Sequence, residues 1–580
     1  MHQPNRFACF AASLAAVLLL QASRPGATPA ADVAASVQTI TCHQNMVAEW
    51  SYRSARAYQD PLLEVELDAI ITAPDGARQT VPAFYSGEGT WRVRFSAPKA
   101  GKYVFRTECS DTENRDLHGR SGTIEVVPYR GQNPLWKHGP LQLSDDRRYI
   151  EHHDGTPFFW LADSWWLGMS SRFRWPGDFQ TLAQDRKQKG FSVIQFAVAF
   201  PCDIAPFDPR GANEAGHAWT EDFGTINPAY FDLTDLRVQW LVRQGLMPNI
   251  VGAWGYYLPA MGTENMKRHW RYVVARYGAF PVTWTLAGEV TLPWYLAEDK
   301  QEQRELQRKE WSEVARYLRG IDPYHRLVTV HPGPDSGGMK PLEDMSTLDF
   351  ILLQPGHGDF ESLPHGIEHM QEARARYSDR PVMMGEINFE GMMAAAGPRI
   401  QRHAFWTSVL QGAPGHCYGA DAIWQFNTRQ APFGKSPGGH AWGNIPWEDA
   451  SQWAGATHVG LGARLLSKYR WWELQPHQDW IEPRGSAENF MQPFCAGIPG
   501  KLRLVYFPRP IASWSRSPAR VLKLEPDVSY RACWLDPITG DTHEIGGVKP
   551  DADSRWTVPA SPILQDWVLA LEAEGAGDQP

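Results

Sequence analysis

Two glutamates in this sequence stand in the same local context, directly after a short apolar run and a glycine. Glu289 ends the run Trp284–Glu289, and Glu386 ends the run Pro381–Glu386. Two carboxylates flanking one bound sugar are what glycosidic cleavage requires, one protonated as the acid and one ionised as the nucleophile. An unperturbed Glu has a pKa of about 4.3, so burial and the neighbouring charge must raise that of the acid. Glu289 and Glu386 are therefore the candidate catalytic pair.

A (β/α)₈ barrel over residues 135–470 is the element set that would position this pair. Apolar runs typical of strands alternate there with helical periodicity, as in the stripe of Met266, Trp270, Val273, Val274 and Tyr277. The eight strand-like runs are Phe158–Ala162, Val193–Phe200, Met247–Ala253, Val282–Ala287, Leu327–Val330, Phe350–Leu353, Pro381–Met384 and Gly415–Trp424. Reactive groups gather at the carboxyl ends of such strands. Because runs four and seven lie on opposite sides of a barrel, their glutamates can face each other.

Other polar and aromatic residues also follow the predicted strands and could hold sugar hydroxyls or rings. Taken alone, a Trp is more often a packing residue than a platform for a sugar, and a His is more often a satisfied hydrogen-bonding group. We expect about half of the set to touch ligand. The candidate substrate-binding residues are Asp163, Trp165, Trp254, Tyr256, His331, Gln354, His357, Glu390, Tyr418 and Trp424.

The regions on either side of the barrel have strand patterning. Residues 37–128 and 471–572 alternate apolar and polar residues in short runs with frequent turns, which predicts a β-sandwich on each side. Residues 1–31 combine Arg6, the short apolar stretch Phe7–Leu20 and small residues after it, the pattern of a cleaved secretory signal. We therefore expect a secreted or periplasmic protein without membrane insertion.

Composition narrows the class further. Lys and Arg number 56 against 65 Asp and Glu, so the net charge of −9 argues against nucleic acid as a partner. The 26 Trp residues favour a carbohydrate partner, because flat aromatic faces suit sugar rings.

His365, Glu368 and His369 match a zinc-peptidase pattern, but a solvated helix start explains them better. We expect no metal and no organic cofactor. The six cysteines after residue 31 leave free thiols and two disulfides equally open, and the oligomeric state is not predicted.

Several stretches resemble the apiosidase-like glycoside hydrolases, a family of (β/α)₈ enzymes related to the retaining clan A. The stretches that carry the resemblance are Ala162–Ser164, Asn227–Asp232, Trp284–Glu289, Gln354–His357, Gly385–Glu386 and Gly415–Gly419. The N-terminal region resembles a domain of unknown function that often precedes these barrels. The C-terminal region, with Trp534–Gly540 and Asp566–Leu569, is similar to a β-domain labelled collagen-binding in relatives. We do not predict collagen binding from that label.

The resemblance implies that Glu289 is the acid/base and Glu386 the nucleophile, in agreement with their positions after the strands. At one place the chain departs from the family pattern. Members typically have Asp where Glu289 stands, and Gly288 replaces the Asn that precedes this Glu in the wider clan.

The sequence therefore predicts a retaining glycoside hydrolase acting on a plant or microbial poly- or oligosaccharide. The alternatives are a non-catalytic carbohydrate-binding protein on a barrel scaffold and an adhesion protein whose sandwiches bind a polymer.

Overall fold

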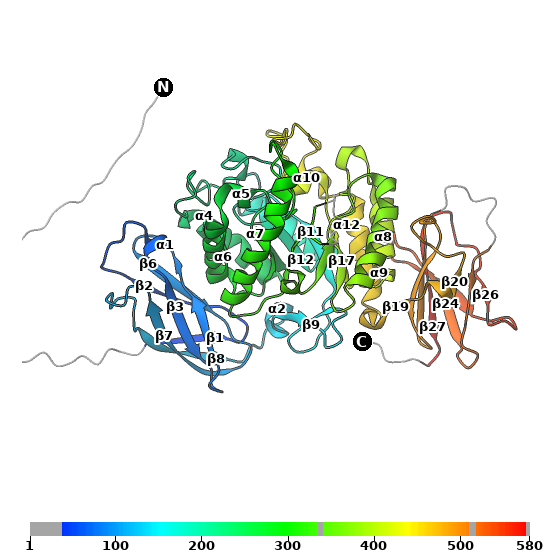
Figure 1. Cartoon of the computed structure of the whole chain (residues 1–580). Coiled ribbons are helices and arrows are strands. Elements are labelled where there is room, and N and C mark those ends of the chain that lie inside the picture. The colour runs from blue at the N-terminus through cyan, green and yellow to red at the C-terminus, as the bar shows by residue number, and fades with distance from the viewer. Residues whose placement is uncertain (1–37, 334–339, 510–517, 576–580) are drawn as a thin grey trace, which may run out of the picture.

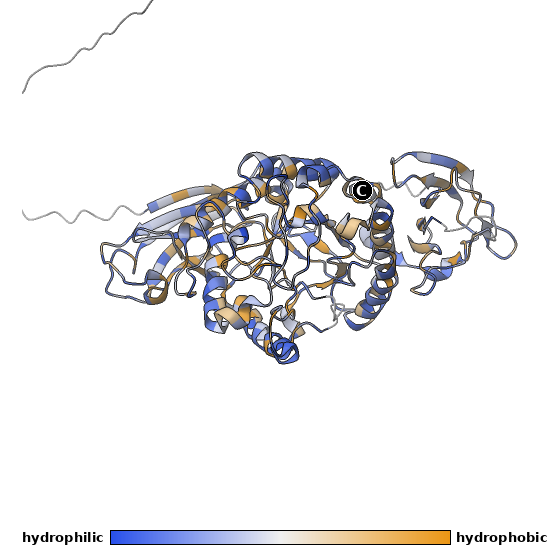
Figure 2. Ribbon diagram, turned by 90° about the horizontal axis from the view of Figure 1, so that it is seen from above, coloured by the Kyte–Doolittle hydropathy of each residue, from blue (hydrophilic) through white to orange (hydrophobic). Residues whose placement is uncertain are grey.

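The structure is a computed structural model that describes residues 38–333, 340–509 and 518–575. A central barrel lies between an N-terminal and a C-terminal group of β-sheets (Figure 1). Viewed from above, helices surround the barrel strands, and the two groups of sheets extend to opposite sides (Figure 2). The predicted barrel with β-rich flanks is thus confirmed. The segment 1–31 lies outside the described residues.

The N-terminal region consists of a five-stranded sheet (order β1-β8-β7-β3-β4) and a three-stranded sheet (order β2-β6-β5). Burial alternates along the strands, as in β7, where Tyr103 and Phe105 are buried and Val104 is exposed. The strands are β1 (Gln38–His43), β2 (Ala48–Arg53), β3 (Leu67–Thr72), β4 (Arg78–Pro82), β5 (Phe84–Tyr85), β6 (Thr90–Phe95), β7 (Gly101–Cys109) and β8 (Ser121–Val127), with α1 (Pro61–Glu64) between β2 and β3. The helix α2 (Pro134–Lys137) and the hairpin of β9 (Leu141–Leu143) and β10 (Ile150–His152) lead to the barrel.

Eight parallel strands form the barrel, in the order β15-β14-β13-β12-β11-β18-β17-β16. They are β11 (Trp160–Ser164), β12 (Val193–Ala197), β13 (Met247–Val251), β14 (Thr283–Thr285), β15 (Val328–Thr329), β16 (Ile351–Leu353), β17 (Val382–Met384) and β18 (Gly415–Tyr418). At the junction of β15 and β16, the Thr329 hydroxyl donates to the Phe350 carbonyl at 2.8 Å. These strands are buried on both faces, which explains their continuous apolar sequence.

Helices on the outside connect the barrel strands. α4 shows why they begin and end where they do: the Asn227 side chain accepts from the Ala229 N–H, Pro228 opens the first turn, and Gly245 ends the helix at φ 79°. The main helices are α3 (Gly177–Lys189), α4 (Pro228–Gln244), α6 (Thr263–Tyr277), α7 (Lys300–Ile321), α8 (Ser362–Arg376), α9 (Pro398–Leu410) and α12 (Ala454–Leu466), and the short ones are α5 (Tyr257–Met261), α10 (Asp421–Trp424) and α11 (Trp447–Ala450).

Two details differ from the sequence prediction. The last strand ends at Tyr418 rather than Trp424, because the chain turns at Ala420 into α10. The connection from β15 to β16 contains the 3-10 turn η3 (Met345–Thr347) within its described residues, where the βα alternation predicts a full helix.

The C-terminal region also has two sheets, with orders β19-β21-β22-β27-β24-β25 and β20-β23-β26. Its strands are β19 (Gln475–Pro476), β20 (Ile481–Glu482), β21 (Phe494–Ile498), β22 (Leu502–Phe507), β23 (Arg520–Val521), β24 (Tyr530–Leu535), β25 (Thr542–Gly547), β26 (Trp556–Thr557) and β27 (Trp567–Ala573). A buried ion pair joins this region to the barrel, with Arg402 of α9 contacting Asp566 at 2.6 and 2.7 Å.

The cysteines Cys42, Cys109, Cys202, Cys417, Cys495 and Cys533 are all buried and free, which decides the question left open by their spacing. Among the described helices, none is both long and apolar enough to cross a membrane.

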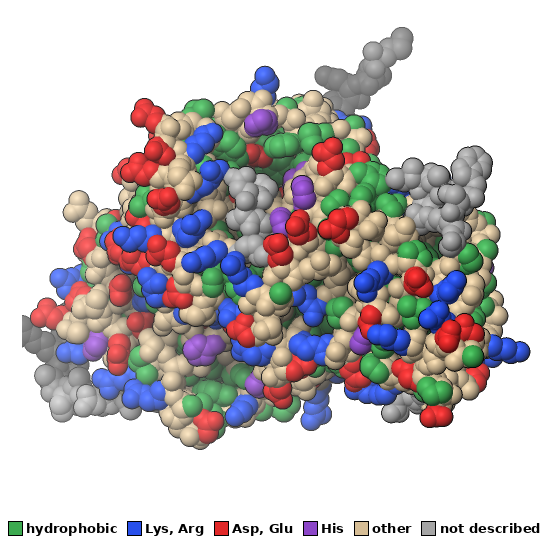
Figure 3. Space-filling view, turned by 45° about the vertical axis from the view of Figure 1, so that its right-hand side comes forward, with side chains coloured by type: hydrophobic (Ala, Val, Ile, Leu, Met, Phe, Trp, Pro, Cys, Tyr) green, Lys and Arg blue, Asp and Glu red, His purple; other side chains and the backbone are tan. Residues whose placement is uncertain are grey.

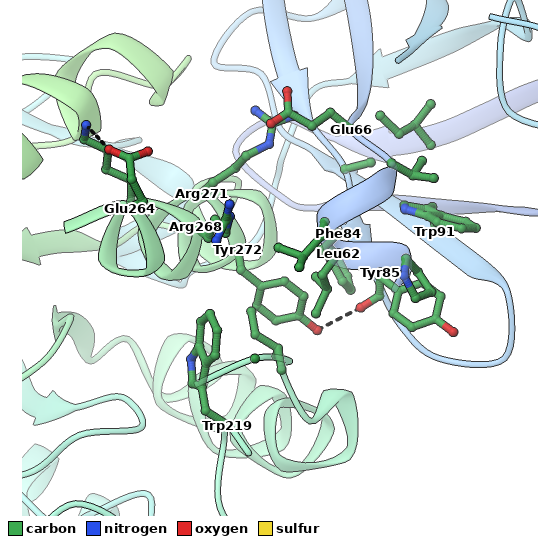
Figure 4. Close-up of a pocket in the computed structure, with 18 of the residues that line it drawn as sticks. Leu62, Glu66, Phe84, Tyr85, Trp91, Trp219, Glu264, Arg268, Arg271 and Tyr272 are labelled. Carbon is green, nitrogen blue, oxygen red and sulfur yellow. Dashed lines mark hydrogen bonds and ion pairs between the residues drawn. The ribbon is translucent and has the colours of Figure 1, made fainter. Parts of the chain in front are cut away.

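The junction of the N-terminal sheets with the barrel combines a cavity and a buried ion network. A cavity of about 300 Å³ lies between β5 and α6, and beside it the Tyr272 hydroxyl donates to the Tyr85 carbonyl at 2.8 Å (Figure 4). Deeper in the junction, Asp235 of α4 accepts from Arg94 of β6 at 2.5 Å and from Arg276 of α6 at 2.9 Å. The Asp235 carboxylate thus bridges two buried guanidinium groups from different parts of the chain, and Glu49 and Asp232 are their second partners.

Replacing Asp235 by Ala is expected to lower the free energy of unfolding by about 3–5 kcal/mol, because Arg94 and Arg276 would lose the buried carboxylate that they share. Asp232→Ala is the matched control, since Asp232 pairs with Arg276 from a half-exposed position and its loss should lower stability by less than about 1 kcal/mol. Urea unfolding followed by tryptophan fluorescence measures both variants. Equal losses for the two variants would contradict the network.

Candidate active site

Glu289 and Glu386 lie together at the carboxyl-terminal mouth of the barrel. Glu289 follows β14 and Glu386 follows β17, and Gln354 follows β16 between them in the chain. The Gln354 amide nitrogen Nε2 is 3.0 Å from Glu289 Oε1 and 3.4 Å from Glu386 Oε1. The two carboxylate oxygens are therefore separated by no more than the sum of these two distances. The meeting of the pair expected from their strand positions is present in the structure.

Glu289 is partly accessible to solvent and its surroundings favour the protonated form. The Trp254 indole Nε1 donates to Glu289 Oε2 at 3.0 Å. Burial and the negative charge of Glu386 together raise the pKa of Glu289 to about 7, although the Trp254 hydrogen bond acts in the opposite direction. The backbone of Glu289 has φ 38°, in the left-handed region that a non-glycine residue rarely occupies, and such strain is common at functional sites.

Glu386 is only 6% exposed, and its surroundings favour the ionised form. His357 Nε2 lies 2.8 Å from Glu386 Oε1, and His331 Nε2 lies 3.3 Å from Oε2. The backbone N–H of Phe389 contacts His357 Nδ1 at 3.2 Å, which orients the ring so that Nε2 points at Glu386. Burial acts to raise the pKa of Glu386, but the hydrogen bonds and charges of His331 and His357 outweigh it and lower the pKa to about 2.

An aromatic wall supports the pair. The Trp166 ring packs edge-on against Trp254, with centroids 5.2 Å apart, and against His331, with centroids 5.4 Å apart. Gly288 makes this packing possible, because a Cβ at that position would lie 2.2 Å from an atom of the Trp254 ring. The departure from the clan pattern at Gly288 thus has a steric reason: the Trp254 ring occupies the space that an Asn side chain would need.

Four of the ten predicted substrate-binding residues contact one or both carboxylates: Trp254, His331, Gln354 and His357. Four others, Asp163, Trp165, Glu390 and Tyr418, are buried and bonded elsewhere.

These four residues, Asp163, Trp165, Glu390 and Tyr418, stabilise the β11–β18 side of the barrel. Asp163 accepts from Arg186 at 2.6 Å and from Trp165 Nε1 at 2.7 Å, while the Tyr418 hydroxyl donates to Glu390 at 2.7 Å. Glu390 also accepts from the Gly455 N–H in α12 at 3.0 Å. These polar atoms are used in ion pairs and hydrogen bonds within the barrel, so we assign this group a structural role.

The last two predicted residues lie under the loops at the mouth. Tyr256 is buried and its hydroxyl lies 2.8 Å from the Ile204 carbonyl. Trp424 is buried in α10 and packs against Phe433, with ring centroids 5.5 Å apart.

The sequence analysis missed Asp203, a third acidic residue near the mouth. It lies in the connection after β12 and accepts from the hydroxyl of Tyr295 and from Trp442 Nε1. Its position after a long apolar run was a usable signal, but its partners come from two other loops that sequence spacing does not place.

The described residues contain no group of three or more His, Cys, Asp or Glu side chains arranged to hold a metal ion. His365 and Glu368 are exposed on the first turns of α8, as expected for a solvated helix face. Acidic and basic side chains are interspersed over the molecular surface shown in Figure 3.

A parallel eight-stranded barrel with two carboxylates facing each other at its carboxyl-terminal mouth is the arrangement of glycoside hydrolases of the barrel type. Comparison with known families agrees. The family described as apiosidase-like, catalytic domain, matches residues 144–473, and the domain of unknown function DUF5060 matches residues 41–110. The chain belongs to the apiosidase-like family.

Solved structures with similar folds are also glycoside hydrolases by description. One, described only as a glycoside hydrolase, is 21% identical with a TM-score of 0.61, covering 77% of this chain and 100% of its own. A glycoside hydrolase family 5 protein from Bacteroides vulgatus is 21% identical with a TM-score of 0.61, covering 77% of this chain and 96% of its own. A candidate glycoside hydrolase from the same organism is 17% identical with a TM-score of 0.65, and the match covers 92% of this chain and 99% of its own. A comparison with curated proteins found no match.

Replacing His357 by Ala is expected to raise the pKa of Glu386 above its value of about 2, because Glu386 would lose one of the two imidazoles that favour its ionised form. Titration of ¹³C-labelled glutamate carboxyls by NMR measures this shift. His365→Ala, on the exposed face of α8, is the matched control and should leave Glu386 unchanged. An unchanged Glu386 titration in the His357 variant would show that the contact does not set its protonation state.

Proposed function

We propose that the protein is a retaining glycoside hydrolase in which Glu386 is the nucleophile and Glu289 the general acid/base. The observation that carries this proposal is the placement of both carboxylates around the single amide of Gln354, in surroundings that shift their pKa values in opposite directions. Pairs of titratable groups driven apart in this way are a common source of separate acid and base roles.

The separation of the two groups supports retention. The contacts of Gln354 Nε2 with Glu289 Oε1 and Glu386 Oε1 bring the two carboxylates close enough to contact one bound sugar, as the short spacing of a retaining site requires. In a retaining site the two carboxyls stand about 5–5.5 Å apart, so the nucleophile reaches the anomeric carbon directly.

The two steps follow from the protonation states. In the first, a Glu386 oxygen bonds to the anomeric carbon while Glu289 gives its proton to the departing glycosidic oxygen. In the second, Glu289 removes a proton from water, the water oxygen bonds to the anomeric carbon, and the bond to Glu386 breaks. Both glutamates then return to their starting protonation states, and the anomeric configuration of the sugar is retained.

The surrounding residues suit these steps. Gln354 donates to both carboxylates and holds them at a fixed separation. His331 and His357 keep Glu386 ionised before the attack. Trp254 fixes the orientation of Glu289, and its indole ring adds an aromatic surface next to the acid. A carbohydrate of plant or microbial origin is the proposed substrate, and the pattern of residues 1–31 supports export from the cytoplasm as part of the proposal.

Glu386→Gln is expected to lower kcat by about 10⁴-fold or more while leaving the fold intact, because no group remains to form the covalent intermediate. Glu289→Gln is the matched variant. Its kcat should fall by about 10²–10⁴-fold for substrates whose leaving group needs protonation, and by much less for aryl glycosides, whose leaving group does not. A screen of aryl glycosides and of plant and bacterial polysaccharides, with circular dichroism of each variant, measures these effects. Wild-type-like activity of Glu386→Gln would overturn the assignment, and a product of inverted configuration by NMR would overturn retention.

The activity of the wild-type protein is expected to fall as the pH rises through about 7, because Glu289 loses the proton that it must donate. No fall is expected on the acid side until the protein unfolds, because Glu386 stays ionised down to a pH of about 2. Measurement of kcat/KM against pH tests this profile. Trp254→Phe should move the alkaline limb to higher pH, because it removes the hydrogen bond that lowers the pKa of Glu289. A rate that stays constant well above neutral pH would contradict these roles.

A further inference from the structure

Asp203 joins three loops at the mouth of the barrel. One of its carboxylate oxygens accepts from the hydroxyl of Tyr295, and the other accepts from Trp442 Nε1 at 3.0 Å. Asp203 lies in the connection after β12, Tyr295 in the connection after β14 and Trp442 in the connection after β18. Both oxygens of a partly buried carboxylate are therefore used to hold segments that follow three different strands.

Independent contacts join the same loops to their neighbours. Arg210, also after β12, donates to the carbonyls of Phe433 and Lys435 after β18 at 3.0 and 2.9 Å. Its guanidinium lies over the Phe433 ring at 4.5 Å. Arg172, after β11, donates to the Ala431 carbonyl at 2.7 Å.

Tyr256 brings the connection after β13 into the same structure. Its hydroxyl bonds to the Ile204 carbonyl, and its ring contacts Tyr295 with centroids 5.7 Å apart. The strands β18, β11, β12, β13 and β14 are consecutive in the barrel, so their connections form one continuous wall over half of the mouth. We call this set of connections the loop wall.

We propose that Asp203 is a positioning residue that holds the loop wall together, and that this wall restricts the protein to cleaving glycosidic bonds at the ends of glycan chains. The restriction to chain ends rests on the proposed glycosidase function. A glycan cleaved at an internal bond must extend past the catalytic pair in both directions. The connections after five consecutive strands, joined into one wall, obstruct the path of a glycan chain across their side of the mouth.

The charge of Asp203 also acts on the acid/base. The groups that face Glu289 are Glu386 after β17, Gln354 after β16, His331 after β15, Tyr295 after β14, Trp254 after β13, and Cys202 and Asp203 after β12. Among them, the negative charges of Glu386 and Asp203 raise the pKa of Glu289. Loss of the Asp203 charge should therefore lower the pKa of Glu289, which a purely structural role of Asp203 would not do.

The first test uses the whole protein and needs no substrate. Asp203→Asn removes the charge and one acceptor at nearly constant volume, and Tyr295→Phe removes only the hydroxyl, so the second variant serves if the first does not fold. Hydrogen exchange by mass spectrometry should show amide exchange about tenfold faster or more in residues 198–208, 291–298 and 436–445 together. Asp222→Asn is the matched control, because Asp222 lies in the same connection and its hydrogen bonds within the described part of the chain are to its near neighbours Thr220 and Gly224.

The second test follows the products from reducing-end-labelled xylo-, manno- and cello-oligosaccharides and from aryl glycosides. Wild type and Asp222→Asn should release single sugars from one chain end, whereas Asp203→Asn and Tyr295→Phe should also release longer fragments. The KM for oligosaccharides should change more than the kcat for aryl glycosides. In the profile of kcat/KM against pH, the alkaline limb of the Asp203→Asn variant should move to lower pH, and that of the Tyr295→Phe variant should move less.

The outcomes separate the two proposals. Exchange that stays unchanged in all three segments, or that rises in the segment of Asp203 alone, would overturn the role of Asp203. Internal cleavage by the wild-type protein would overturn the chain-end restriction while leaving the glycosidase intact. Failure of the wild type to cleave any glycoside would overturn the proposed function and the restriction with it, and the exchange data would still decide whether Asp203 holds the loop wall.

Discussion

The repulsion between Glu289 and Glu386 is the constraint on which the rest of the site depends. Two carboxylates that share the amide of Gln354 in a poorly solvated mouth are unfavourable if both are ionised. The structure resolves this conflict through unequal surroundings. Two histidines face Glu386 and lower its pKa, while Glu289 has an indole N–H as its close neighbour and retains its proton to a pH of about 7.

The barrel is what makes these unequal surroundings possible. The contributors follow the five consecutive strands β13 to β17 along the chain, so short segments of chain supply each group from a fixed direction. The buried cluster around Arg186 and Asp163 fixes the β11–β18 side of the barrel. The flanking sheets are tied to the barrel helices by buried ion pairs, Asp235 with two arginines on one side and Arg402 with Asp566 on the other. The helices around the carboxylate pair are thus themselves anchored to the sheets outside the barrel.

Much of this architecture is readable from the sequence, because strand patterning and strand order follow from local apolar runs. The position of a Glu after a Gly at the end of two such runs was enough to predict that Glu289 and Glu386 meet. The same rule did not distinguish His357, which faces Glu386, from Asp163, which pairs with Arg186 of α3. Both stand at the ends of predicted strands, and only the position of a partner distant in the sequence decides how each side chain is used. Asp203 was missed for a related reason, since loop conformation depends on contacts between distant segments. The free cysteines also required coordinates, because spacing does not determine pairing.

The account predicts that one carboxylate becomes covalently bonded to the sugar, and this can be measured directly. A 2-deoxy-2-fluoro derivative of a glycoside that the protein cleaves slows the release of the glycosyl-enzyme, so the adduct accumulates and can be found by intact-mass and peptide analysis. We expect a single added glycosyl group on Glu386. An adduct on Glu289 or on any other residue, or turnover of the parent glycoside with inversion and without an adduct, would contradict the account.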